Sequence, residues 1–425
     1  MKILVVGGGG REHAVVKSLK KSEKAEKIYV LPGNGGIAAD AECYPIKATD
    51  LDGIERFAIE HKVDFAVVTP DDPLVLGCVD RLEARGIPCF GPNKAAAIIE
   101  GSKVFSKQLM KKHSIPTAGS EVFDDADKAI AYLEKHDYPV VIKADGLALG
   151  KGVVIANSFD EAKLAVNEMM RDKVFGASGS RVLIEEFLTG PEVSVLSFTD
   201  GNIVVPMVSS MDHKRALDND EGLNTGGMGT VAPNPYYTAE IAKTCEETIF
   251  LPTIRAMKAE GRTFKGCLYF GLMLTPKGPK VIEYNCRFGD PETQVVLPLL
   301  ESDLLEIMQA VQRGELTKEA VKFKNGAACC VVSASDGYPK KYESGFEITL
   351  PNELKENEHV FIAGAKKEGE KLLSAGGRVL GAVATADSLK EAIDAAYALS
   401  DKIYFKNAYR RKDIGKRALA AREEV

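Results

Sequence analysis

Four short apolar segments in the first ninety residues each lead into a loop rich in glycine or proline. They lie at 2–6, 27–31, 65–69 and 88–90. The first segment shows no alternation of polar and apolar residues, which is typical of a strand buried on both faces of a parallel sheet. A helical pattern follows it from Glu12 to Lys20. This order predicts a doubly wound α/β domain with ligands bound at the carboxyl ends of its strands.

The first loop, Gly7 to Gly10, runs directly into Arg11, Glu12 and His13. It lacks the third glycine of the dinucleotide fingerprint, and the second strand does not end in the acid that would hold a ribose hydroxyl. The interpretation of the chain as a nicotinamide oxidoreductase therefore depends on the glycine run alone. Free N–H groups and the helix dipole at such a loop favour an anionic ligand, and the alternative is a tight turn without a ligand.

Composition and charge argue against several function classes. The chain has 425 residues and a net charge of −6, which gives no sign of a nucleic-acid partner. No stretch approaches the roughly 20 apolar residues of a membrane span. The eight cysteines form no C-x-x-C pair. We therefore expect reduced thiols in a cytoplasmic protein, with no disulfide framework and no zinc site.

A second unit begins near residue 102. Ser102 to His113 predicts a helix capped by Ser102, and two strands at 140–143 and 153–156 predict a hairpin. Lys143 ends the first of these strands. The loop between the strands contains Gly146, Gly150, Lys151 and Gly152. Glycines there let the backbone approach nucleotide phosphates closely, and the alternative is a mobile hairpin with exposed lysines.

A third pattern is an apolar strand that ends in carboxylates. Residues 182–184 are apolar, and after them come Glu185, Glu186, Phe187, Leu188 and Glu192. Such a strand can present backbone groups to an adenine edge and a carboxylate to ribose hydroxyls. Taken alone, the pattern favours the alternative of an edge strand with solvated acids.

The most specific pattern runs from Val281 to Thr293. In a strand, Glu283, Asn285 and Arg287 share one face. A carboxylate, an amide oxygen and a guanidinium there suit a phosphate bound to Mg²⁺, which prefers oxygen ligands. The alternative is an ion pair between Glu283 and Arg287. Because these positions are about 13 Å apart in a straight strand, that pairing is poor.

Two further loops, at 211–215 and 224–229, combine charged and glycine-rich sequence. They contain Asp212, Lys214, Asn224, Thr225, Gly226 and Gly227. Such loops can recognise a small carboxylate and a phosphate, although a surface loop explains them equally well. In the last hundred residues we predict strands at 327–333, 346–350, 359–363 and 378–384, and a helix after Ser388.

Seven segments, in this order, resemble the phosphoribosylamine–glycine ligase family of the ATP-grasp superfamily. They are GGGREH (8–13), PGN (32–34), EGSK (100–103), IKADGLALGKG (142–152), SMDHKR (210–215), NTGGMG (224–229) and EYNCRFGDPETQ (283–294). The resemblance covers essentially the whole chain. It implies a doubly wound domain (1–101), an ATP-grasp module (102–325) with a mobile lid at about 118–190, and a small β-rich domain (326–425).

The resemblance also implies an activity. ATP, with Mg²⁺ or Mn²⁺, would drive the joining of glycine to 5-phosphoribosylamine through glycyl phosphate in de novo purine synthesis. The products would be glycinamide ribonucleotide, ADP and phosphate. We expect a monomer or weak dimer with no nucleic-acid or membrane partner. The main rivals are another ATP-grasp ligase, such as a carboxyaminoimidazole ribonucleotide synthase that uses bicarbonate, and a non-catalytic nucleotide-binding module.

Residue roles follow from the resemblance in the same way. Metal ligands would be Glu283 and Asn285, and catalytic residues Arg287, Lys143 and Asp290. ATP would contact Lys103, Lys143, Gly146, Gly150, Lys151, Gly152, Glu185, Glu186, Phe187, Leu188 and Glu192. The two substrates would contact Gly9, Gly10, Arg11, Glu12, Gly33, Asn34, Asp71, Asp212, Lys214, Asn224, Thr225, Gly226, Gly227, Arg287 and Asp290.

Two departures from the family pattern stand out. Where the family usually has Gly-Pro-Glu after the third strand, this chain has Thr69-Pro70-Asp71, so the acid is one methylene shorter. Many ATP-grasp enzymes also carry an acidic metal ligand about a dozen residues before the Glu283 position. Here that neighbourhood is Phe270-Gly271-Leu272, which weakens the expectation of a two-metal site.

Overall fold

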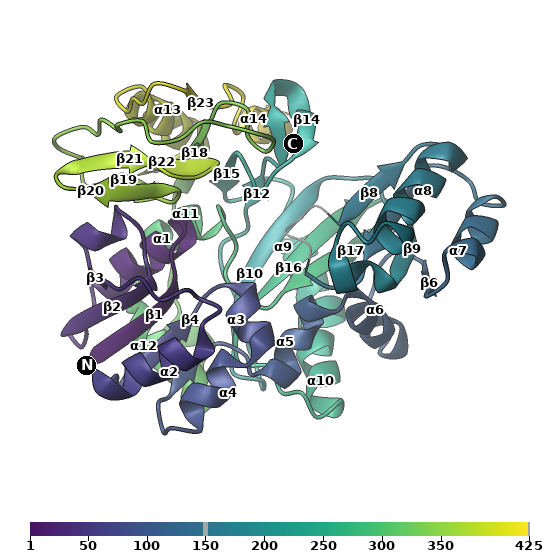
Figure 1. Cartoon of the computed structure of the whole chain (residues 1–425), viewed down its shortest axis with the longest axis horizontal. Coiled ribbons are helices and arrows are strands. Elements are labelled where there is room, and N and C mark those ends of the chain that lie inside the picture. Colours follow the sequence, from purple (N-terminus) through teal and green to yellow (C-terminus); the bar gives the residue numbers. More distant parts are fainter. Residues whose placement is uncertain (148–151, 424–425) are drawn as a thin grey trace.

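The computed structural model describes residues 1–147 and 152–423. Its N-terminal part is a parallel five-stranded sheet in the order β3-β2-β1-β4-β5 (Figure 1). The strands are β1 (Lys2–Gly7), β2 (Lys27–Pro32), β3 (Glu42–Cys43), β4 (Phe65–Val68) and β5 (Cys89–Phe90). Leu4 and Val6 enter one apolar core and Ile3 and Val5 another, so β1 is buried on both faces. This confirms the predicted doubly wound sheet.

Helices accompany this sheet, and several begin at a side chain that satisfies a free backbone N–H group. They are α1 (Gly10–Leu19), α2 (Leu51–Glu60), α3 (Asp71–Leu76), α4 (Cys78–Glu83) and α5 (Lys94–Gly101). Asp50 caps α2 by accepting from the Gly53 N–H, and Asn93 caps α5 by accepting from the Ala96 N–H. A short helical turn, η1 (Ile37–Ala39), lies between β2 and β3.

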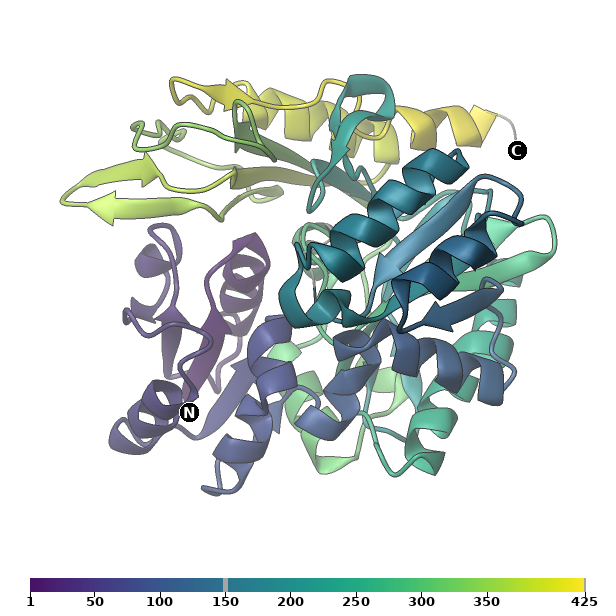
Figure 2. The same ribbon diagram turned by 45° about the vertical axis from the view of Figure 1, so that its right-hand side comes forward.

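The predicted hairpin belongs to a separate antiparallel sheet, in the order β6-β9-β7-β8. Its strands are β6 (Ser120–Phe123), β7 (Val140–Ala144), β8 (Val153–Ala156) and β9 (Val182–Glu186). The helices α7 (Ala126–Leu133) and α8 (Phe159–Val166) cover one face of it (Figures 1 and 2). A π-helical turn (Asn167–Arg171) and a short turn (Gly176–Ser180) follow α8. The unit has an apolar core of its own. We call it the lid sheet after the mobile lid predicted at about 118–190, which stays a prediction.

A second four-stranded sheet, in the order β11-β10-β16-β17, forms the centre of the molecule. Its strands are β10 (Glu192–Thr199), β11 (Val204–Pro206), β16 (Gly266–Thr275) and β17 (Gly278–Asn285). The helical segments of this part are α6 (Lys103–Lys112), α9 (Ala239–Cys245), η5 (Glu246–Phe250), α10 (Leu251–Ala259), α12 (Leu304–Arg313) and η7 (Lys318–Ala320). The predicted Ser102 cap of α6 is confirmed, because its hydroxyl accepts from the Phe105 N–H.

The C-terminal sheet includes strands from the centre of the chain. Its order is β12-β15-β18-β22-β19, with β23 paired to β18. The strands are β12 (Met211–Asp212), β15 (Gly229–Ala232), β18 (Ala327–Ser335), β19 (Glu358–Ile362), β22 (Arg378–Ala386) and β23 (Ala408–Tyr409). Thus β12 and β15 share a sheet with strands beyond residue 326. The three-part division of the chain stays a prediction.

The remaining elements lie around this sheet. They are the hairpins β13 (Arg215–Leu217) with β14 (Glu221–Asn224) and β20 (Ala365–Glu368) with β21 (Lys371–Ser374), the turns η4 (Asp218–Asp220) and η6 (Leu297–Leu299), and the helices α11 (Thr293–Val296), α13 (Leu389–Ser400) and α14 (Lys416–Glu423). The predicted strand at 346–350 is wrong: Glu347 and Thr349 form only isolated bridges, to Leu373 and Tyr404. Glu347 and Thr349 pair with two different segments, so no continuous ladder with one neighbouring strand forms.

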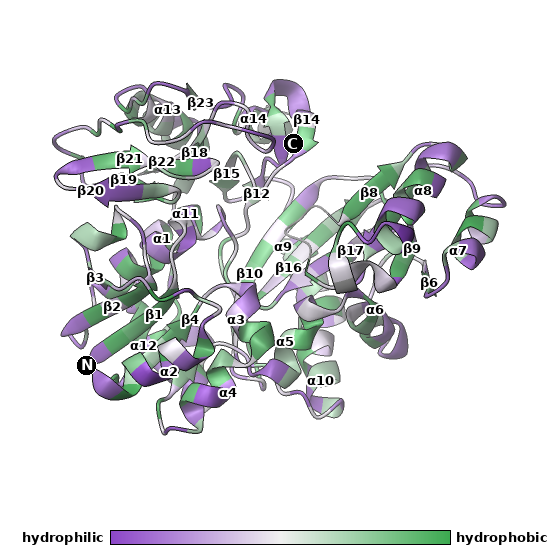
Figure 3. Cartoon of the chain, in the orientation of Figure 1, coloured by the Kyte–Doolittle hydropathy of each residue, from purple (hydrophilic) through white to green (hydrophobic). Residues whose placement is uncertain are grey.

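Hydropathy follows the layers. Apolar residues dominate the strands of the N-terminal sheet and of the lid sheet, whereas β20 and the outer faces of the helices are largely polar (Figure 3). Among the described residues, none of the helices combines the length and apolar character needed to span a bilayer.

Candidate active site

Two side chains with oxygen atoms, Glu283 and Asn285, stand on β17 and were predicted to hold a metal ion, which stays a prediction. Glu283 and Asn285 lie opposite Gly271 and Tyr269 in the ladder with β16, and the irregularity next to Glu283 is a β-bulge. In the described part of the chain, neither side chain makes a hydrogen bond or ion pair, and both are half-buried. Two free hard oxygens fit a divalent ion that completes its shell with phosphate and water. The described residues hold no group of three or more acidic, histidine or cysteine ligands.

Gly271 lies opposite Glu283 in the ladder, in the segment where many ATP-grasp enzymes carry a further acidic ligand. A Cβ atom placed on Gly271 would lie 3.1 Å from Cγ of Glu283, which is tighter than ordinary contact. A side chain at residue 271 would therefore require the Glu283 side chain to shift by a few tenths of an ångström.

Arg287 does not lie on the strand, because β17 ends at Asn285. Its guanidinium pairs with Glu100, Nη2 to Oε1 at 3.0 Å, and the predicted alternative of a Glu283–Arg287 ion pair is absent from the described ion pairs. Glu100 also accepts from the Cys286 N–H at 2.7 Å. Burial raises the pKa of Glu100, and Arg287 opposes that effect. The buried Nε of Arg287 has no hydrogen-bond partner in the described structure, so this atom is available to a ligand.

Asp71 is brought close to this pair by the start of α3. Its charge raises the pKa of both Arg287 and Glu100. Asp71, which is one methylene shorter than the glutamate usual in the family, therefore lies near Arg287 and Glu100. Its predicted contact with a substrate remains a prediction.

Lys143 belongs to a buried charge network. Its Nζ lies 3.0 Å from Oε2 of Glu185 and donates to the Ile282 carbonyl at 3.1 Å. The second oxygen of Glu185 lies 3.2 Å from Nζ of Lys107, which also donates to Thr117 Oγ1 at 2.6 Å. All three charged side chains are almost fully buried. Glu185, predicted to contact the nucleotide, thus holds two lysines.

Lys107 was not among the predicted site residues. The sequence signal that could have identified Lys107 was its place on the buried face of α6, because a buried lysine requires a partner for its charge. Desolvation lowers the pKa of Lys107 to about 8, although Glu185 opposes the shift.

The pKa of Lys107 predicts a pH-dependent stability difference. The folded pKa of about 8 lies below the usual lysine value of 10.5, so the unfolded chain binds more protons between these pH values. The contribution of Lys107 to the free energy of unfolding therefore rises with pH across this window. We expect the stability of wild type relative to Lys107→Met to increase from pH 7.5 to 10, measured by urea unfolding. A flat difference would contradict the assignment.

The start of α6 is tied to the hairpin loop. Lys103 donates to the Gly146 carbonyl at 2.7 Å, and Asp145 accepts from the Ser102 hydroxyl at 2.9 Å and from the Val104 N–H at 3.1 Å. Gly152 returns the chain to the sheet by accepting from the Ala144 N–H. Two predicted phosphate contacts, Gly150 and Lys151, lie outside the described residues.

The predicted nucleotide segment after β9 is exposed. Glu186 pairs with Lys280 at 2.7 Å and accepts from the Gly119 N–H at 3.0 Å. Phe187 is exposed and Leu188 is half-buried. Glu192, predicted to contact ribose, pairs with Lys214 at 2.8 Å, which was predicted to contact a substrate. The structure brings these two predicted residues together.

Asp290 is the point where three parts of the chain meet. Its Oδ1 lies 3.3 Å from Nη1 of Arg378 and accepts from Gln294 at 2.8 Å. A Cβ on Gly9 would lie 3.4 Å from its Oδ2. Arg378 also donates to the Gly226 carbonyl at 2.8 Å. The N-terminal glycine loop, the 224–229 loop and β22 therefore converge here, and Arg378 was not predicted.

The 224–229 loop is held from within. Thr225 donates to the Lys214 carbonyl at 2.9 Å and accepts from the Gly227 N–H at 2.9 Å. A Cβ on Gly227 would lie 2.6 Å from Oδ1 of Asp212, so only glycine allows this approach. Asn224, at the end of β14, is exposed.

A buried acid next to this loop was also missed. Glu292 accepts from the Tyr269 hydroxyl at 3.2 Å and from the Ser194 hydroxyl at 3.3 Å. Burial raises the pKa of Glu292 and, with the charge of Glu292, the pKa of Asp212. Glu292 follows Asp290 in the GDPET segment, so its place in the motif was the only signal.

Several N-terminal residues that were predicted to contact a substrate make hydrogen bonds within the protein. Glu12 accepts from the Gly9 N–H and from Arg11 Nε, both at 2.5 Å, and Arg11 donates to the Phe288 carbonyl at 3.2 Å. Asn34 donates to the carbonyls of Gly8 and Ile362, and its oxygen accepts from the N–H groups of Gly36 and Ile37. Glu12 and Asn34 therefore shape the two loops.

Two glycines in these loops permit close contacts. A Cβ on Gly10 would lie 2.7 Å from Nε2 of Gln294, and one on Gly33 would lie 2.3 Å from Sγ of Cys43. Gly33 also has φ of +71°, a conformation that favours glycine.

Comparison with known proteins places this arrangement in a family. Models of phosphoribosylglycinamide synthetase match its N domain at residues 1–100, its ATP-grasp (A) domain at 101–293 and its C domain at 328–417. The chain is 50% identical over 414 residues to phosphoribosylamine–glycine ligase of Caldanaerobacter subterraneus, covering 97% of this chain and 99% of the relative. It is 46% identical to the enzyme of that name from Halalkalibacterium halodurans over 99% of this chain and 98% of the relative.

Solved structures agree. The crystal structure of phosphoribosylamine–glycine ligase from Thermotoga maritima matches with a TM-score of 0.86 and 34% identity, covering 97% of this chain and 100% of that one. The biotin carboxylase domain of a Hydrogenobacter thermophilus 2-oxoglutarate carboxylase shares the fold alone, with a TM-score of 0.76 and 18% identity over 96% of this chain and 91% of that one. The ATP-grasp assignment implies use of ATP with a divalent metal ion. The chain belongs to the phosphoribosylglycinamide synthetase family, whose members are ATP-dependent ligases of the ATP-grasp fold.

Proposed function

We propose that the chain joins glycine to 5-phosphoribosylamine at the expense of ATP, giving glycinamide ribonucleotide, ADP and phosphate in de novo purine biosynthesis. The observation that carries this proposal is the convergence of three chain segments on Asp290, beside Arg287 and β17. The name of the relatives supports the choice of substrates. We propose a cytoplasmic monomer or weak dimer without nucleic-acid or membrane partners.

The ATP side of the site lies between the lid sheet and β17. Lys143 reaches the Ile282 carbonyl from the lid sheet, and Lys103 reaches Gly146. Burial lowers the pKa of Lys103, and the charge of the nearby Glu283 opposes that shift. We assign these two lysines to ATP phosphates, and the exposed segment from Glu186 to Leu188 to the adenine.

Glu283 and Asn285 are the proposed ligands of Mg²⁺ or Mn²⁺. When bound there, the ion would neutralise phosphate charge and orient the γ-phosphate. Two observations support this assignment: the two side chains lie on the same face of β17, and their oxygens make no hydrogen bond or ion pair among the described residues.

The proposed chemistry has two steps. A glycine carboxylate oxygen attacks the γ-phosphorus of ATP, and the bond between that phosphorus and the β–γ bridging oxygen breaks. The products of this step are glycyl phosphate and ADP. The ribosylamine nitrogen then attacks the acyl carbon, inorganic phosphate leaves and the nitrogen loses a proton. Arg287, with its free Nε, and Lys143 would offset charge on the transferring group. Closure of the lid sheet would keep water from the acyl phosphate.

The substrate side would be built around Asp290. The carboxylate of Asp290 is suited to the ammonium group of glycine, and Arg378 and the 224–229 loop would frame the same pocket. Gly9, Gly10 and Arg11 would meet the phosphoribosylamine from the N-terminal domain. The approach of Gly9 to Asp290 supports placing the two substrates next to each other.

The test is phosphate release from purified protein with ATP and Mg²⁺. We expect release that requires both glycine and phosphoribosylamine generated in place. Release with bicarbonate in place of glycine would move the assignment to a carboxylating relative. ATP binding without release, whatever the acceptor, would leave a nucleotide-binding module and overturn the proposal.

A further inference from the structure

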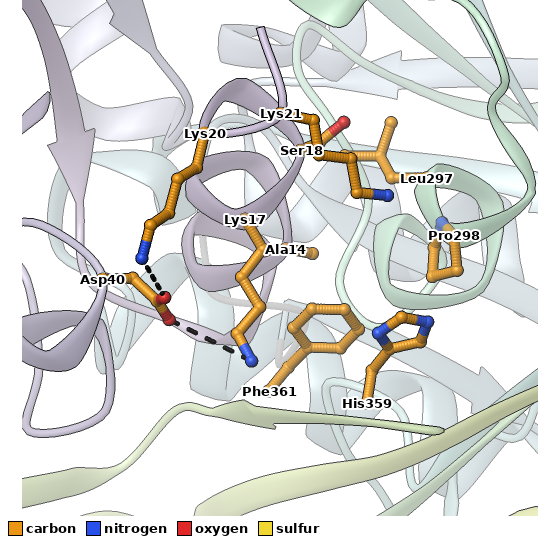
Figure 4. A pocket seen from close by; sticks show the side chains of 10 residues that line it. All are labelled: Ala14, Lys17, Ser18, Lys20, Lys21, Asp40, Leu297, Pro298, His359 and Phe361. Carbon is orange, nitrogen blue, oxygen red and sulfur yellow. Dashed lines mark hydrogen bonds and ion pairs between the residues drawn. The ribbon is translucent and has the colours of Figure 1, made fainter. Parts of the chain in front are cut away.

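Two lysines can share one carboxylate at little cost where water reaches them, and α1 provides an example. Lys20 and Lys17 lie 2.9 and 4.0 Å from the two oxygens of Asp40, and Figure 4 shows both side chains directed at this carboxylate. The side chain of Lys20 is 54% exposed and that of Lys17 is 30% exposed. Water therefore solvates the excess positive charge, and the cluster needs no further partner.

The Glu185 network has the same composition but is closed to solvent. Lys107 and Lys143 lie 3.2 and 3.0 Å from the two oxygens of Glu185, and all three side chains are at most 6% exposed. A buried carboxylate needs one cation to offset its charge. A second buried lysine adds its own desolvation cost and leaves one positive charge in excess. Charge balance therefore explains one of the two lysines but not the other.

Lys143 is the lysine with a place in the proposed reaction, because its ammonium also meets β17. Its Nζ donates to the carbonyl of Ile282, the residue before the proposed metal ligand Glu283, at 3.1 Å. An ammonium group has three N–H donors. Within the described part of the chain, the partners of this ammonium are Ile282 and Glu185 alone. One donor is therefore left for a phosphate oxygen.

Lys107, in contrast, is held by the protein. Its Nζ donates to Thr117 Oγ1 at 2.6 Å and to the Ala118 carbonyl at 3.2 Å. The Thr117 hydroxyl donates in turn to the Val281 carbonyl at 2.7 Å. The network thus begins and ends on consecutive carbonyl groups of β17, those of Val281 and Ile282. It connects α6 and the lid sheet to the strand that carries the proposed metal ligands.

The charge of Lys107 is the partner of one oxygen of Glu185. Oε1 of Glu185 is buried and accepts no hydrogen bond in the described structure, and the Lys107 ammonium lies 3.2 Å from it. Without that charge, both carboxylate oxygens would be free to hold the Lys143 ammonium. The repulsion between the two ammonium groups would also be lost. Lys143 would then be bound more tightly to Glu185 and would have less to offer a phosphate.

We propose that Lys107 is a positioning residue for Lys143, and that it acts through Glu185 to keep the Lys143 ammonium available to the phosphates of ATP. The inference rests on the proposed function, in which Lys143 binds these phosphates. Lys107 itself makes no contact with the nucleotide. Its effect therefore falls on the affinity for phosphate groups and not on the affinity for adenosine.

Nucleotide binding to the full-length protein, measured by isothermal titration calorimetry with Mg²⁺, provides the test. The probes are adenylyl imidodiphosphate, an ATP analogue that does not transfer its γ-phosphoryl group, and adenosine, which has no phosphate. Lys107→Met is expected to bind the analogue about tenfold more weakly and adenosine with unchanged affinity. Lys112→Met makes the same substitution in an exposed ion pair with Glu260 on the same helix, and should bind both probes as wild type does.

Two further variants separate positioning from the loss of a charge. Thr117→Val keeps every charge and the shape of the side chain but removes the hydroxyl that anchors Lys107. We expect it to bind the analogue roughly threefold more weakly. Adding Glu185→Gln to Lys107→Met releases Lys143 from the carboxylate, so the double variant should bind the analogue more tightly than Lys107→Met does.

Several results would overturn the inference. They are unchanged binding of the analogue by Lys107→Met or by Thr117→Val, an equal loss of adenosine binding, which would indicate a general disturbance of the lid sheet, or still weaker binding by the double variant. Failure of wild type to bind the analogue would remove the proposed function and this inference with it. Tight binding by wild type and Lys107→Met alike would remove this inference alone.

Discussion

Glu283→Gln is expected to reduce ligase turnover by about a thousandfold, ~4 kcal/mol in activation free energy, without unfolding the protein. Glutamine keeps the shape of the side chain but removes the charge that a metal ligand supplies. Because Glu283 makes no hydrogen bond or ion pair in the described structure, the fold does not depend on it. The measurement is steady-state phosphate release, together with a thermal unfolding curve.

Two controls make this result specific. Glu301→Gln removes an exposed carboxylate by the same chemical change, and we expect full activity. Binding of ADP should remain in Glu283→Gln without metal, but Mg²⁺ should no longer strengthen it. A variant that turns over at the wild-type rate would show that Glu283 is not a metal ligand.

Glu185→Gln is expected to destabilise the protein by about 3–5 kcal/mol, because it leaves two buried lysines without a counter-charge. Lys107 and Lys143 lie 3.2 and 3.0 Å from the two oxygens of this carboxylate. The deficit should shrink as pH rises above 8, because Lys107, whose pKa burial lowers to about 8, then loses its charge and needs no partner. Urea unfolding at several pH values measures both effects.

The neighbouring residue supplies the matched control. Glu186→Gln breaks an exposed pair with Lys280, and such pairs contribute less than about 1 kcal/mol. Equal destabilisation by the two substitutions would show that burial of the Lys107–Glu185–Lys143 network does not determine its effect.

Local patterns were sufficient to predict much of the fold. Apolar runs such as 2–6 predict buried parallel strands because both faces need apolar side chains, and the lid hairpin follows from two short strands around glycines. The strand predicted at 346–350 shows the limit of this reasoning. Alternation at Phe346, Ile348 and Leu350 satisfies packing against a core, but it does not supply a continuous backbone partner.

Site residues can be predicted from sequence only where they lie within one motif. The spacing of Glu283 and Asn285 led to a prediction that remains to be tested, whereas Arg378 contacts the Asp290 carbonyl across 88 positions of sequence. Nothing near Arg378 in the sequence marks that contact. Lys107 and Glu100 were missed for a related reason, since a buried charge is recognised only when its partner is known.

The mixed origin of the C-terminal sheet has a consequence for how this chain can be divided. β15 pairs with β18 from Gly229↔Val331 to Ala232↔Ala328, so a cut near residue 326 would expose a strand edge on each piece. Fragments separated there are natural partners for reassembly by strand addition, in the manner of a split reporter. The same open edge would make the isolated N-terminal fragment prone to pair with copies of itself.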